Sequence, residues 1–318
     1  MTPPARRALG ASGIHVSELA LGSWRTFERI PREQGVSVMK KAREIGINFL
    51  DDARYNDETG TAPIKTGYSE VVFGEIFRAS GWKRDEVVLA NKLWWEFWPE
   101  EKAAAELDGS LTRMGMDYID LAYAERPPEG LALDEIVHDI GALIAAGKLR
   151  AWGVLNWPAD LIKDAAHVAA RQGVPLPSAA QLAYSLVRRS PVEDQEMARA
   201  LDESGARVVA SFTLEGGALT GKYLERGAAG RLSGSLDAEL HQSALQVAGD
   251  LRSFAAERGS SAAATAIAFA LLNERVASVL FGATAPGQLT ENAAAVELAA
   301  RMDDRAIAEL RGLAKSST

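Results

Sequence analysis

The sequence predicts a single (β/α)₈ barrel, and three observations support this fold class. Eight short apolar runs recur along the chain, segments of helical length separate them, and the runs are largely apolar instead of alternating. Continuous apolar runs indicate strands that are covered on both faces, as in a parallel sheet flanked by helices. An open, doubly wound sheet is the alternative, but the Gly-x-Gly-x-x-Gly turn expected after an early strand is missing.

The predicted elements alternate along the chain. We expect strands at 19–22, 47–50, 87–91, 119–124, 151–155, 179–183, 208–212 and 279–282. We expect helices at 32–45, 69–78, 99–114, 133–146, 158–171, 191–204 and 286–299, and two more between 240 and 273, the second capped by Ser260-Ser261. Pro158, Pro191 and Pro286 open three of these helices, where the missing N–H of proline costs no hydrogen bond.

Two segments are longer than ordinary connections. Residues 52–67 and 220–240 contain glycine and charged side chains, and both follow strands on the face where barrels carry substrate and cofactor loops. No linker and no internal repeat divides the chain. Residues 1–318 are therefore expected to form one domain.

Composition restricts the class of protein. Of the 318 residues, 47% are hydrophobic and 25% charged, and no apolar stretch approaches 18 residues. These values predict a soluble globular protein without a membrane span. The basic pair Arg6-Arg7 is not followed by the apolar segment of a signal peptide, so we expect a cytoplasmic protein.

The rarer residues exclude several chemistries. The chain has no cysteine and four histidines without ligand spacing, so we expect neither thiolate catalysis nor a metal. A formal net charge of −8 and the lack of clustered Lys and Arg argue against a nucleic-acid partner. We expect a small-molecule substrate, and the sequence leaves the oligomeric state open.

Polar side chains follow three of the predicted strands. Asp51 and Tyr55 follow the second strand, Lys92 the third and Glu125 the fourth. Because the carboxyl ends of all barrel strands open onto one face, these side chains are expected to converge. A lysine at a buried strand end needs a carboxylate partner, for which Asp51 is the candidate. The pair is either a structural ion pair or, with Tyr55 as proton donor, part of a catalytic site.

Motifs along nearly the whole chain resemble one family. They are Gly46 to Tyr55, Gly67-Tyr68-Ser69-Glu70 with Gly74, Arg84 to Lys92, Ser110-Leu111 with Gly115 to Leu121, Gly153 to Trp157, Leu219 to Tyr223, and Gly282-Ala283-Thr284 with Gln288, Glu291 and Asn292. Together and in this order they closely resemble the aldo-keto reductase superfamily. The resemblance implies a (β/α)₈ barrel that binds NADPH without a Rossmann domain.

The resemblance also implies roles for individual residues. Asp51, Tyr55, Lys92 and Glu125 match the four catalytic positions, with Tyr55 as the general acid. The implied cofactor-binding positions are Asn156 and Gln181 for the nicotinamide carboxamide, Ser211 and Phe212 at the end of the seventh strand with Leu214, Gly216 and Lys222 after it, and Gly282, Thr284, Gln288, Glu291 and Asn292 for the adenosine and 2′-phosphate end. By composition alone, Gln288, Glu291 and Asn292 would be an exposed helix face.

Glu125 departs from the family pattern, because most relatives have histidine there. An ionised Glu125 would oppose the oxyanion that forms during carbonyl reduction, whereas a protonated one would donate a hydrogen bond to it. Burial beside Asp51 could keep the carboxyl neutral. Some members of the superfamily with glutamate here reduce the double bond of an enone. The alternative is a tolerated polar residue in an ordinary ketone or aldehyde reductase.

Three further departures concern the proton donor and the cofactor. The gap between Asp51 and Tyr55 is one residue shorter than usual, so either a local bulge restores the phenol or Tyr55 is displaced, with Tyr68 and Tyr123 as the nearest substitutes. Leu155 replaces the serine that normally precedes Asn156. Ser211 stands where relatives have a tyrosine under the nicotinamide, which leaves Phe212 or nothing to stack there.

Aromatic residues crowd the segment after Lys92. Trp94, Trp95, Phe97 and Trp98 follow it closely, and Trp24 lies at the end of the first strand. They indicate an apolar pocket for a bulky or planar substrate, or a packed loop that closes the barrel. We assign Trp24, Trp94, Trp95 and Trp98 to the pocket.

The leading prediction is an NADPH-dependent oxidoreductase that reduces the carbonyl of a bulky, largely apolar ketone or aldehyde, with Tyr55 as general acid. Reduction of an enone double bond directed by Glu125 is the alternative within enzymes. An NADPH-binding regulatory protein with little turnover is the alternative from another class.

Overall fold

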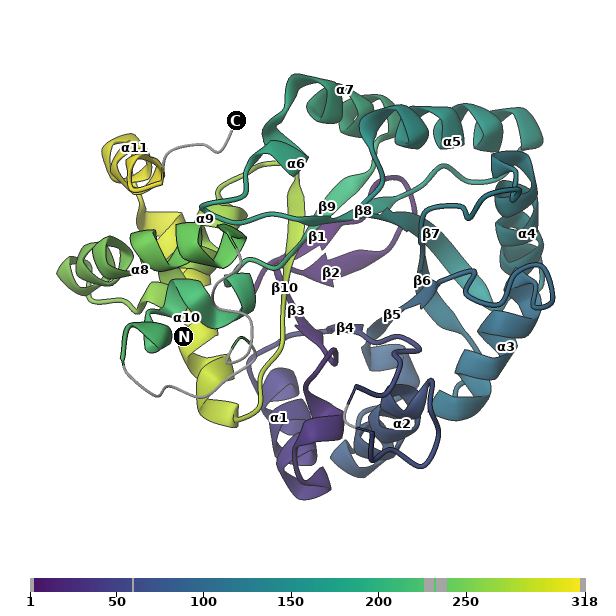
Figure 1. The fold of residues 1–318 in the computed structure, drawn as a ribbon, viewed down its shortest axis with the longest axis horizontal. Coiled ribbons are helices and arrows are strands. Elements are labelled where there is room, and N and C mark those ends of the chain that lie inside the picture. The colour runs from purple at the N-terminus through teal and green to yellow at the C-terminus, as the bar shows by residue number, and fades with distance from the viewer. Residues whose placement is uncertain (1–2, 59, 226–231, 233–238, 315–318) are drawn as a thin grey trace.

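Eight parallel strands close into a barrel in the computed structural model, which describes residues 3–58, 60–225, 232 and 239–314. The strands follow the order β10-β3-β4-β5-β6-β7-β8-β9, and the helices surround them (Figure 1). Their bounds are Leu19–Gly22 (β3), Phe49–Asp51 (β4), Val88–Leu93 (β5), Ile119–Ala124 (β6), Leu149–Leu155 (β7), Ala179–Ala183 (β8), Arg207–Ser211 (β9) and Val276–Phe281 (β10). The predicted (β/α)₈ fold is confirmed.

The helices largely follow the predicted segments. They are Arg32–Glu44 (α1), Tyr68–Ser80 (α2), Ala103–Met114 (α3), Leu133–Ala145 (α4), Ala159–Gln172 (α5), Ser190–Glu193 (α6), Gln195–Ser204 (α7), Glu239–Glu257 (α8), Ala262–Leu271 (α9), Pro286–Arg301 (α10) and Asp304–Gly312 (α11). Short 3₁₀ turns within the described residues are Phe27–Arg29 (η1), Arg84–Glu86 (η2), Glu215–Thr220 (η3) and Lys222–Leu224 (η4).

Two helical predictions needed correction. The single helix expected at 191–204 is divided, because Asp194 has φ −57° and ψ 140° and interrupts the helical path between α6 and α7. Helix α11 was not expected; its N-cap is Asp303, whose side chain accepts a hydrogen bond from the Ala306 amide. Ser261, and not the preceding serine, caps α9 through the Ala264 amide. Most of the predicted 220–240 loop lies outside the described residues.

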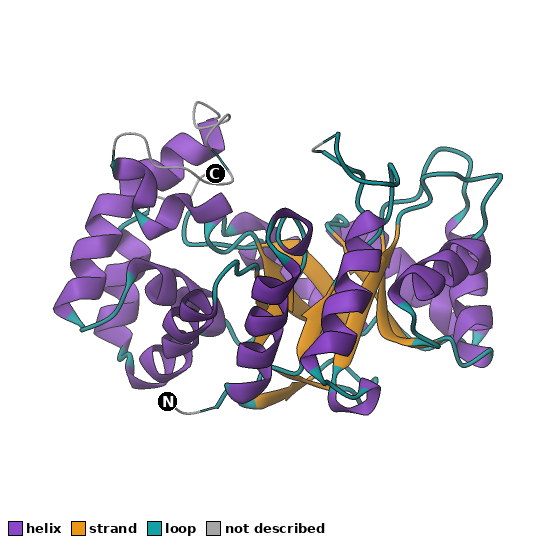
Figure 2. Cartoon of the chain, turned by 90° about the horizontal axis from the view of Figure 1, so that it is seen from below, coloured by secondary structure: helices purple, strands orange, loops and turns teal. Residues whose placement is uncertain are grey.

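A hairpin that the sequence did not reveal covers the amino-terminal end of the barrel (Figure 2). It pairs Arg6–Ala8 (β1) with His15–Ser17 (β2) in antiparallel register. Leu9, Ile14 and Val16 are buried in one cluster with barrel-interior residues such as Phe49 and Leu121. Strands of three residues are too short for a periodic pattern, which is why only the structure identifies this plug.

Close contacts between elements require glycine at two places. A Cβ on Gly74 of α2 would lie 2.2 Å from the Met114 carbonyl oxygen of α3, and one on Gly153 of β7 would lie 2.3 Å from the Ala179 carbonyl oxygen of β8. Any larger residue would push these elements apart. Both glycines therefore set the spacing of the helices and strands around the barrel.

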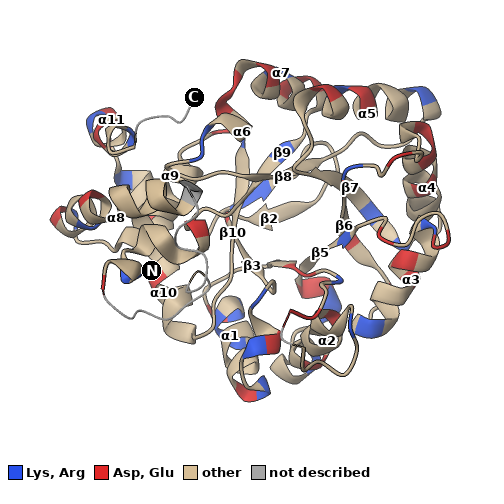
Figure 3. Ribbon diagram, in the orientation of Figure 1, with Lys and Arg blue, Asp and Glu red and all other residues tan. Residues whose placement is uncertain are grey.

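Charged residues gather on the surrounding helices and loops, and the strands carry few of them (Figure 3). Two of the exceptions are Asp51, which ends β4, and Lys92, which lies near the end of β5. The parallel register places Lys92 beside Tyr123 of β6. Among the described residues, no helix is both long and apolar enough to cross a membrane.

Candidate active site

A buried ion pair stands at the carboxyl ends of β4 and β5. The Lys92 Nζ atom lies 2.6 Å from Asp51 Oδ1 and also donates to the Asp52 carbonyl oxygen at 3.2 Å. Asp51 Oδ2 accepts a hydrogen bond of 2.9 Å from the Gln181 side-chain amide. All three side chains are almost fully buried. Pairing and additional hydrogen bonds offset the large cost of burying these charges.

Tyr55 lies beside this pair despite the short gap that follows Asp51. Its amide donates to the Ala53 carbonyl oxygen at 3.0 Å, which is the pattern of a γ-turn centred on Arg54. This tight turn brings the phenol ring to 5.6 Å from Lys92 Nζ, measured to the ring centroid. The structure therefore brings Asp51, Lys92 and Tyr55 together.

The two substitute tyrosines lie in different places. The Tyr123 ring is inside the barrel, with its centroid 5.9 Å from Lys92 Nζ, and its side chain is fully buried. Burial, and next the negative charge of Asp51, raise the pKa of Tyr123 well above its usual range, so this phenol keeps its proton. Tyr68 begins α2 and accepts a hydrogen bond from Arg32 instead of facing Lys92.

Asp52 is a second buried carboxyl that the sequence did not single out. Its Oδ1 accepts a hydrogen bond from the Ser23 hydroxyl, and the buried Oδ2 has no hydrogen-bond partner in the part of the chain that the structure describes. Burial, followed by the charge of Glu70, raises the pKa of Asp52 well above its usual range. Asp51, whose Oδ1 lies 2.6 Å from Lys92 Nζ, is the carboxylate that pairs with the ammonium.

Glu125 follows β6 at the mouth of the barrel. Its amide donates to the Leu93 carbonyl oxygen at 2.9 Å, and its Oε1 accepts a hydrogen bond of 2.9 Å from the Arg126 amide. The side chain is half-buried. Glu125 is thus less deeply buried than Asp51, which is almost fully enclosed.

Aromatic rings surround Tyr55 on two sides. Ring centroids are 6.4 Å apart for Trp24 and Tyr55, and 6.1 Å apart for Tyr55 and Trp94. Phe212, whose side chain is 42% exposed, packs edge-on against Trp24 at 5.6 Å. Two of the expected pocket residues, Trp24 and Trp94, therefore lie around the phenol.

The other two expected pocket residues pack elsewhere. Trp95 is buried in the main hydrophobic core, and its indole N–H donates to the Glu125 carbonyl oxygen at 3.1 Å. Trp98 is half-buried and packs against the same core, with Lys102 Nζ 5.6 Å from its ring centroid. These two rings pack the loop after β5 against the core, which is the alternative to a pocket that the sequence analysis gave.

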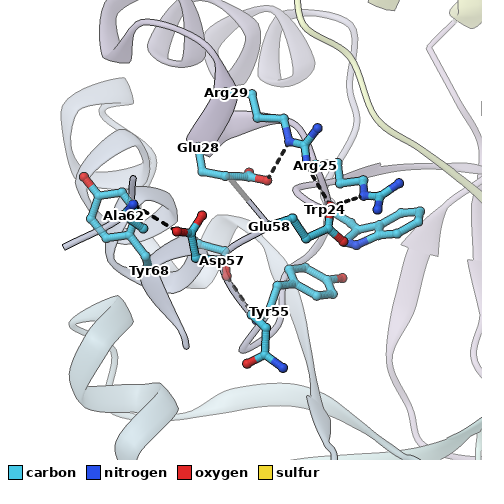
Figure 4. A pocket seen from close by; sticks show the side chains of 11 residues that line it. Trp24, Arg25, Glu28, Arg29, Tyr55, Asp57, Glu58, Ala62 and Tyr68 are labelled. Atoms are coloured by element: carbon cyan, nitrogen blue, oxygen red, sulfur yellow. Dashed lines mark hydrogen bonds and ion pairs between the residues drawn. The ribbon is translucent and has the colours of Figure 1, made fainter. Parts of the chain in front are cut away.

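A pocket opens on one side of Tyr55, between η1 and the segment after β4 (Figure 4). Trp24, Tyr55 and Tyr68 give it aromatic walls, and charged side chains complete them. Arg25 Nε and Arg29 Nη2 both donate to Glu58 Oε2, at 2.5 and 2.7 Å. The Arg25 guanidinium also lies 4.8 Å from the Trp24 ring centroid. Sequence reasoning missed these charges, because exposed Arg and Glu residues are ordinary in loops.

The expected nicotinamide residues are spread over three strand ends. Asn156, after β7, has a positive φ of 52°, and its Oδ1 accepts a 3.3 Å hydrogen bond from the Ala183 amide. Ser211, at the end of β9, has a buried hydroxyl without a partner among the described residues. Gln181 is held by Asp51, as given above. The orphaned Ser211 hydroxyl and the exposed Phe212 ring fit a polar aromatic ligand at this mouth.

The loop after β9 is built around two glycines. Gly216 and Gly217 have φ values of 64° and 96°, a conformation that favours glycine, and Leu214 directly precedes the turn. Lys222 is exposed, with Nζ 4.7 Å from the Tyr223 ring centroid. An exposed ammonium in a tight loop is suited to an anionic ligand such as a pyrophosphate.

Glu215 anchors the same loop, and the sequence analysis had not selected it. This buried carboxylate accepts hydrogen bonds of 2.6 Å from the Ser185 hydroxyl and 2.7 Å from Arg188 Nη2. The Arg188 guanidinium also lies 5.6 Å from the Phe212 ring centroid. A glutamate beside a Gly-Gly turn gives no sequence signal of its own, because its partners are on the connection after β8.

The expected adenosine-end residues lie between β10 and the first turns of α10. Gln288 Oε1 accepts a 2.7 Å hydrogen bond from the Thr284 amide, and Gly282 precedes this turn. Glu291 is exposed, whereas Asn292 is 4% exposed. The amino-terminal end of a helix favours negative charge, so the position is compatible with a phosphate group.

The fold and the site define a (β/α)₈ barrel with a buried Asp51–Lys92 pair at the carboxyl ends of its strands, and a family comparison identifies the class of protein. Residues 18–315 match the model of the Aldo/keto reductase family. The chain therefore belongs to the aldo/keto reductase family.

Similar proteins are named as channel subunits. A probable voltage-gated potassium channel subunit beta of Oryza sativa subsp. japonica is 30% identical over 323 residues, covering 97% of this chain and 96% of the relative. A protein with the same description from Arabidopsis thaliana is 30% identical and covers 91% of this chain and 90% of the relative. A putative voltage-gated potassium channel subunit beta of Schizosaccharomyces pombe is 30% identical and covers 92% of this chain and 88% of the relative.

Proposed function

We propose that this protein is an NADPH-dependent oxidoreductase that reduces the carbonyl of a bulky, largely apolar ketone or aldehyde. The observation that carries the proposal is the buried Lys92–Asp51 pair, 2.6 Å long, beside the Tyr55 ring. A phenol next to an ammonium can give up its proton at modest cost, because the positive charge stabilises the phenolate that remains. Membership of the aldo/keto reductase family supports the same reaction class.

The buried pair, Tyr55 and Gln181 each have a separate task in the proposed mechanism. NADPH, when bound, supplies the hydride. Tyr55 donates a proton to the carbonyl oxygen, and Lys92 stabilises the resulting phenolate. Asp51 keeps the ammonium in place, and Gln181 in turn fixes the free oxygen of Asp51. The pre-formed pair requires little reorganisation when charge develops.

The residues for the cofactor follow the rim formed by β7, β8, β9 and β10. Asn156, Ser211 and Gln181 offer polar groups for a carboxamide, and the exposed Phe212 ring offers a stacking surface. Lys222 is assigned to the phosphates. Thr284, Gln288, Glu291 and Asn292 are assigned to the adenosine and 2′-phosphate end, which is the basis for proposing NADPH.

The substrate class follows from the rings around Tyr55. Trp24, Trp94 and Phe212 present large apolar surfaces at low entropic cost, which favours a bulky or planar substrate over a small sugar. The protein is proposed to act in the cytoplasm on a small molecule.

Two other functions rest on particular observations. Glu125 at the barrel mouth favours reduction of an enone double bond, if its carboxyl is protonated when substrate binds. The names of the three relatives given above, each a channel beta subunit, favour an NADPH-binding regulatory protein with little turnover.

One experiment separates these functions. The protein is mixed with NADPH and a panel of bulky aromatic aldehydes, ketones, quinones and enones, and the absorbance of the reduced cofactor is followed. We expect oxidation with aromatic aldehydes or ketones. Tight NADPH binding without oxidation by any substrate would support the regulatory function instead, and oxidation by enones alone would support double-bond reduction.

A further inference from the structure

Another buried carboxylate, Glu106 of α3, lies outside the Asp51–Lys92 pair and binds donors near two strand ends. Its side chain is 2% exposed. Oε1 accepts hydrogen bonds from Arg54 Nη2 at 3.1 Å and from the Trp94 amide at 2.7 Å, and Oε2 accepts one from the Trp95 amide at 3.2 Å. Donors from the segments after β4 and at the end of β5 thus meet on one carboxylate.

The tied segments carry the proposed proton donor and one aromatic wall. Arg54 is the residue before Tyr55, and it is the centre of the tight turn that brings the phenol to Lys92. Trp94 follows Leu93, the last residue of β5, and its ring packs 6.1 Å from that of Tyr55. Glu106 therefore touches both segments without touching the candidate reacting groups.

The turn at Trp95 depends on the same carboxylate. Trp95 has a φ of 58°, in the left-handed region that aromatic residues rarely adopt. Its amide is bound to Glu106, and its indole N–H is bound to the Glu125 carbonyl oxygen. Two hydrogen bonds therefore keep the strained turn in place, and the one from the indole N–H connects it to the end of β6 at Glu125.

Arg54 has other partners, but they lie nearer the surface. Its guanidinium contacts Glu101 at 3.3 Å and Glu96 at 3.8 Å, and these side chains are 28% and 34% exposed. Neither forms the amide hydrogen bonds that Glu106 does. Three carboxylates can balance the charge of Arg54, but of these three only Glu106 also accepts hydrogen bonds from the Trp94 and Trp95 amides.

We propose that Glu106 is a positioning residue of the active site, which fixes Tyr55 through Arg54 and fixes Trp94 through the backbone. The inference rests on the proposed function, since it assumes that Tyr55 donates a proton to a substrate held against Trp94. Burial raises the pKa of Glu106, while the Trp94 amide, the Arg54 charge and the Trp95 amide oppose this rise. A carboxylate suits the role because it accepts from all three N–H groups at once. A glutamine side chain has only one oxygen, so its NH₂ group would face one of the N–H groups that Glu106 now accepts from.

The test compares Glu106→Gln with two matched controls. Glu101→Gln removes a surface partner of the same arginine. Asp120→Asn removes a fully buried carboxylate of β6 that accepts from Arg84, Arg150 and the Leu89 amide near the opposite end of the barrel. The readouts are kcat and KM for an aromatic aldehyde, the Kd for NADPH, the melting temperature, and the titration of Tyr55 by NMR with ¹³Cζ-labelled tyrosine, assigned with Tyr55→Phe.

Glu106→Gln is expected to lower kcat at least tenfold, to raise KM at least threefold and to shift the Tyr55 titration, with the Kd for NADPH changed less than twofold. Asp120→Asn is expected to lower the melting temperature about as much as Glu106→Gln does, while its kcat stays within twofold of the wild type. Glu101→Gln is expected to leave both kcat and KM within twofold of the wild type. Equal kinetic losses in Glu106→Gln and Asp120→Asn, or an unshifted Tyr55 titration in Glu106→Gln, would overturn the proposal.

Should Glu106→Gln not fold, Arg54→Lys tests the same connection from its other end. This variant keeps the charge but loses the planar fork. A shifted Tyr55 titration would support the positioning role, and an unchanged one would overturn it. Because the NMR titration needs no turnover, a wild-type protein that reduces no substrate would contradict the proposed function without deciding the role of Glu106.

Discussion

Lys92 and Asp51 form an ion pair of 2.6 Å with their side chains only 4% and 2% exposed. Removing one partner of such a pair leaves an uncompensated buried charge, which is far more costly than losing a surface pair. The pair also determines where a phenolate could be stabilised, because the same ammonium lies 5.6 Å from the Tyr55 ring centroid. The stability of the fold and the proposed proton transfer therefore involve the same two side chains.

Lys92→Met is expected to lower kcat at least 100-fold and to destabilise the fold by about 3–5 kcal/mol, because Asp51 stays buried without its cation. Melting temperature and single-turnover NADPH oxidation measure the two effects. Lys148→Met is the control, since Lys148 forms a 2.6 Å pair with Asp108 on the surface, where each side chain is more than a third exposed. Its cost should stay below about 1 kcal/mol. Equal losses for both variants would contradict a special role for the buried pair.

Tyr55→Phe tests the proton donor. Removing a general acid costs about 10²- to 10⁴-fold in rate, so we expect a loss of this size in kcat with the Kd for NADPH nearly unchanged. Tyr123→Phe is the matched control, because Tyr123 also lies near Lys92 but is fully buried. It should keep most of the activity. The opposite result, an active Tyr55→Phe and an inactive Tyr123→Phe, would move the proton donor to β6.

Asp52→Asn is expected to stabilise the protein at neutral pH. Burial raises the pKa of Asp52 well above 3.8 in the folded state. Between the unfolded and folded pKa values the native state holds a proton that the unfolded state has lost, so stability falls as pH rises through this window. The amide has no such penalty and can still accept the Ser23 hydrogen bond.

The melting temperature of Asp52→Asn should therefore exceed that of the wild type at pH 8, by at least about 2 °C on the usual scale for a domain of this size. The difference should shrink as the pH approaches 4. Differential scanning calorimetry across this range makes the comparison. A constant difference at all pH values would mean that the titration of Asp52 is not its source.

Glu125→His tests which reaction the glutamate at the barrel mouth favours. The half-buried carboxylate would oppose an oxyanion at the carbonyl, so its replacement is expected to raise ketone reduction about tenfold. Rates on a matched ketone and enone are compared in both proteins. If Glu125→His instead abolishes enone reduction with no gain on the ketone, Glu125 directs double-bond reduction.

Trp94→Leu should raise KM for a bulky aromatic aldehyde several-fold, because it removes a ring that faces Tyr55. Trp98→Leu is the comparison, since that ring packs against the core. It is expected to lower the melting temperature with little change in KM. Similar KM values for both variants would show that Trp94 does not contact the substrate.

The sequence by itself determined the barrel and the place of its polar strand ends. Strand and helix periodicity arise from neighbours a few residues apart, so the predicted strands and most helices agree with the observed ones. Asp51 and Lys92 could be paired in advance, because a lysine at a buried strand end needs a carboxylate. The family was likewise recognisable from its ordered motifs, and residues 18–315 match it.

Only the tertiary structure decided which side chains meet across long separations. Gln181 binds Asp51 across 130 positions, and Glu106 binds Arg54 across 52. No local pattern encodes such partners, because a buried glutamate on an amphipathic helix shows that it needs a donor but not which one. The same holds for Trp95 and Trp98, which pack in or against the core, and for the β1–β2 hairpin. Their positions follow from packing, which depends on every element at once.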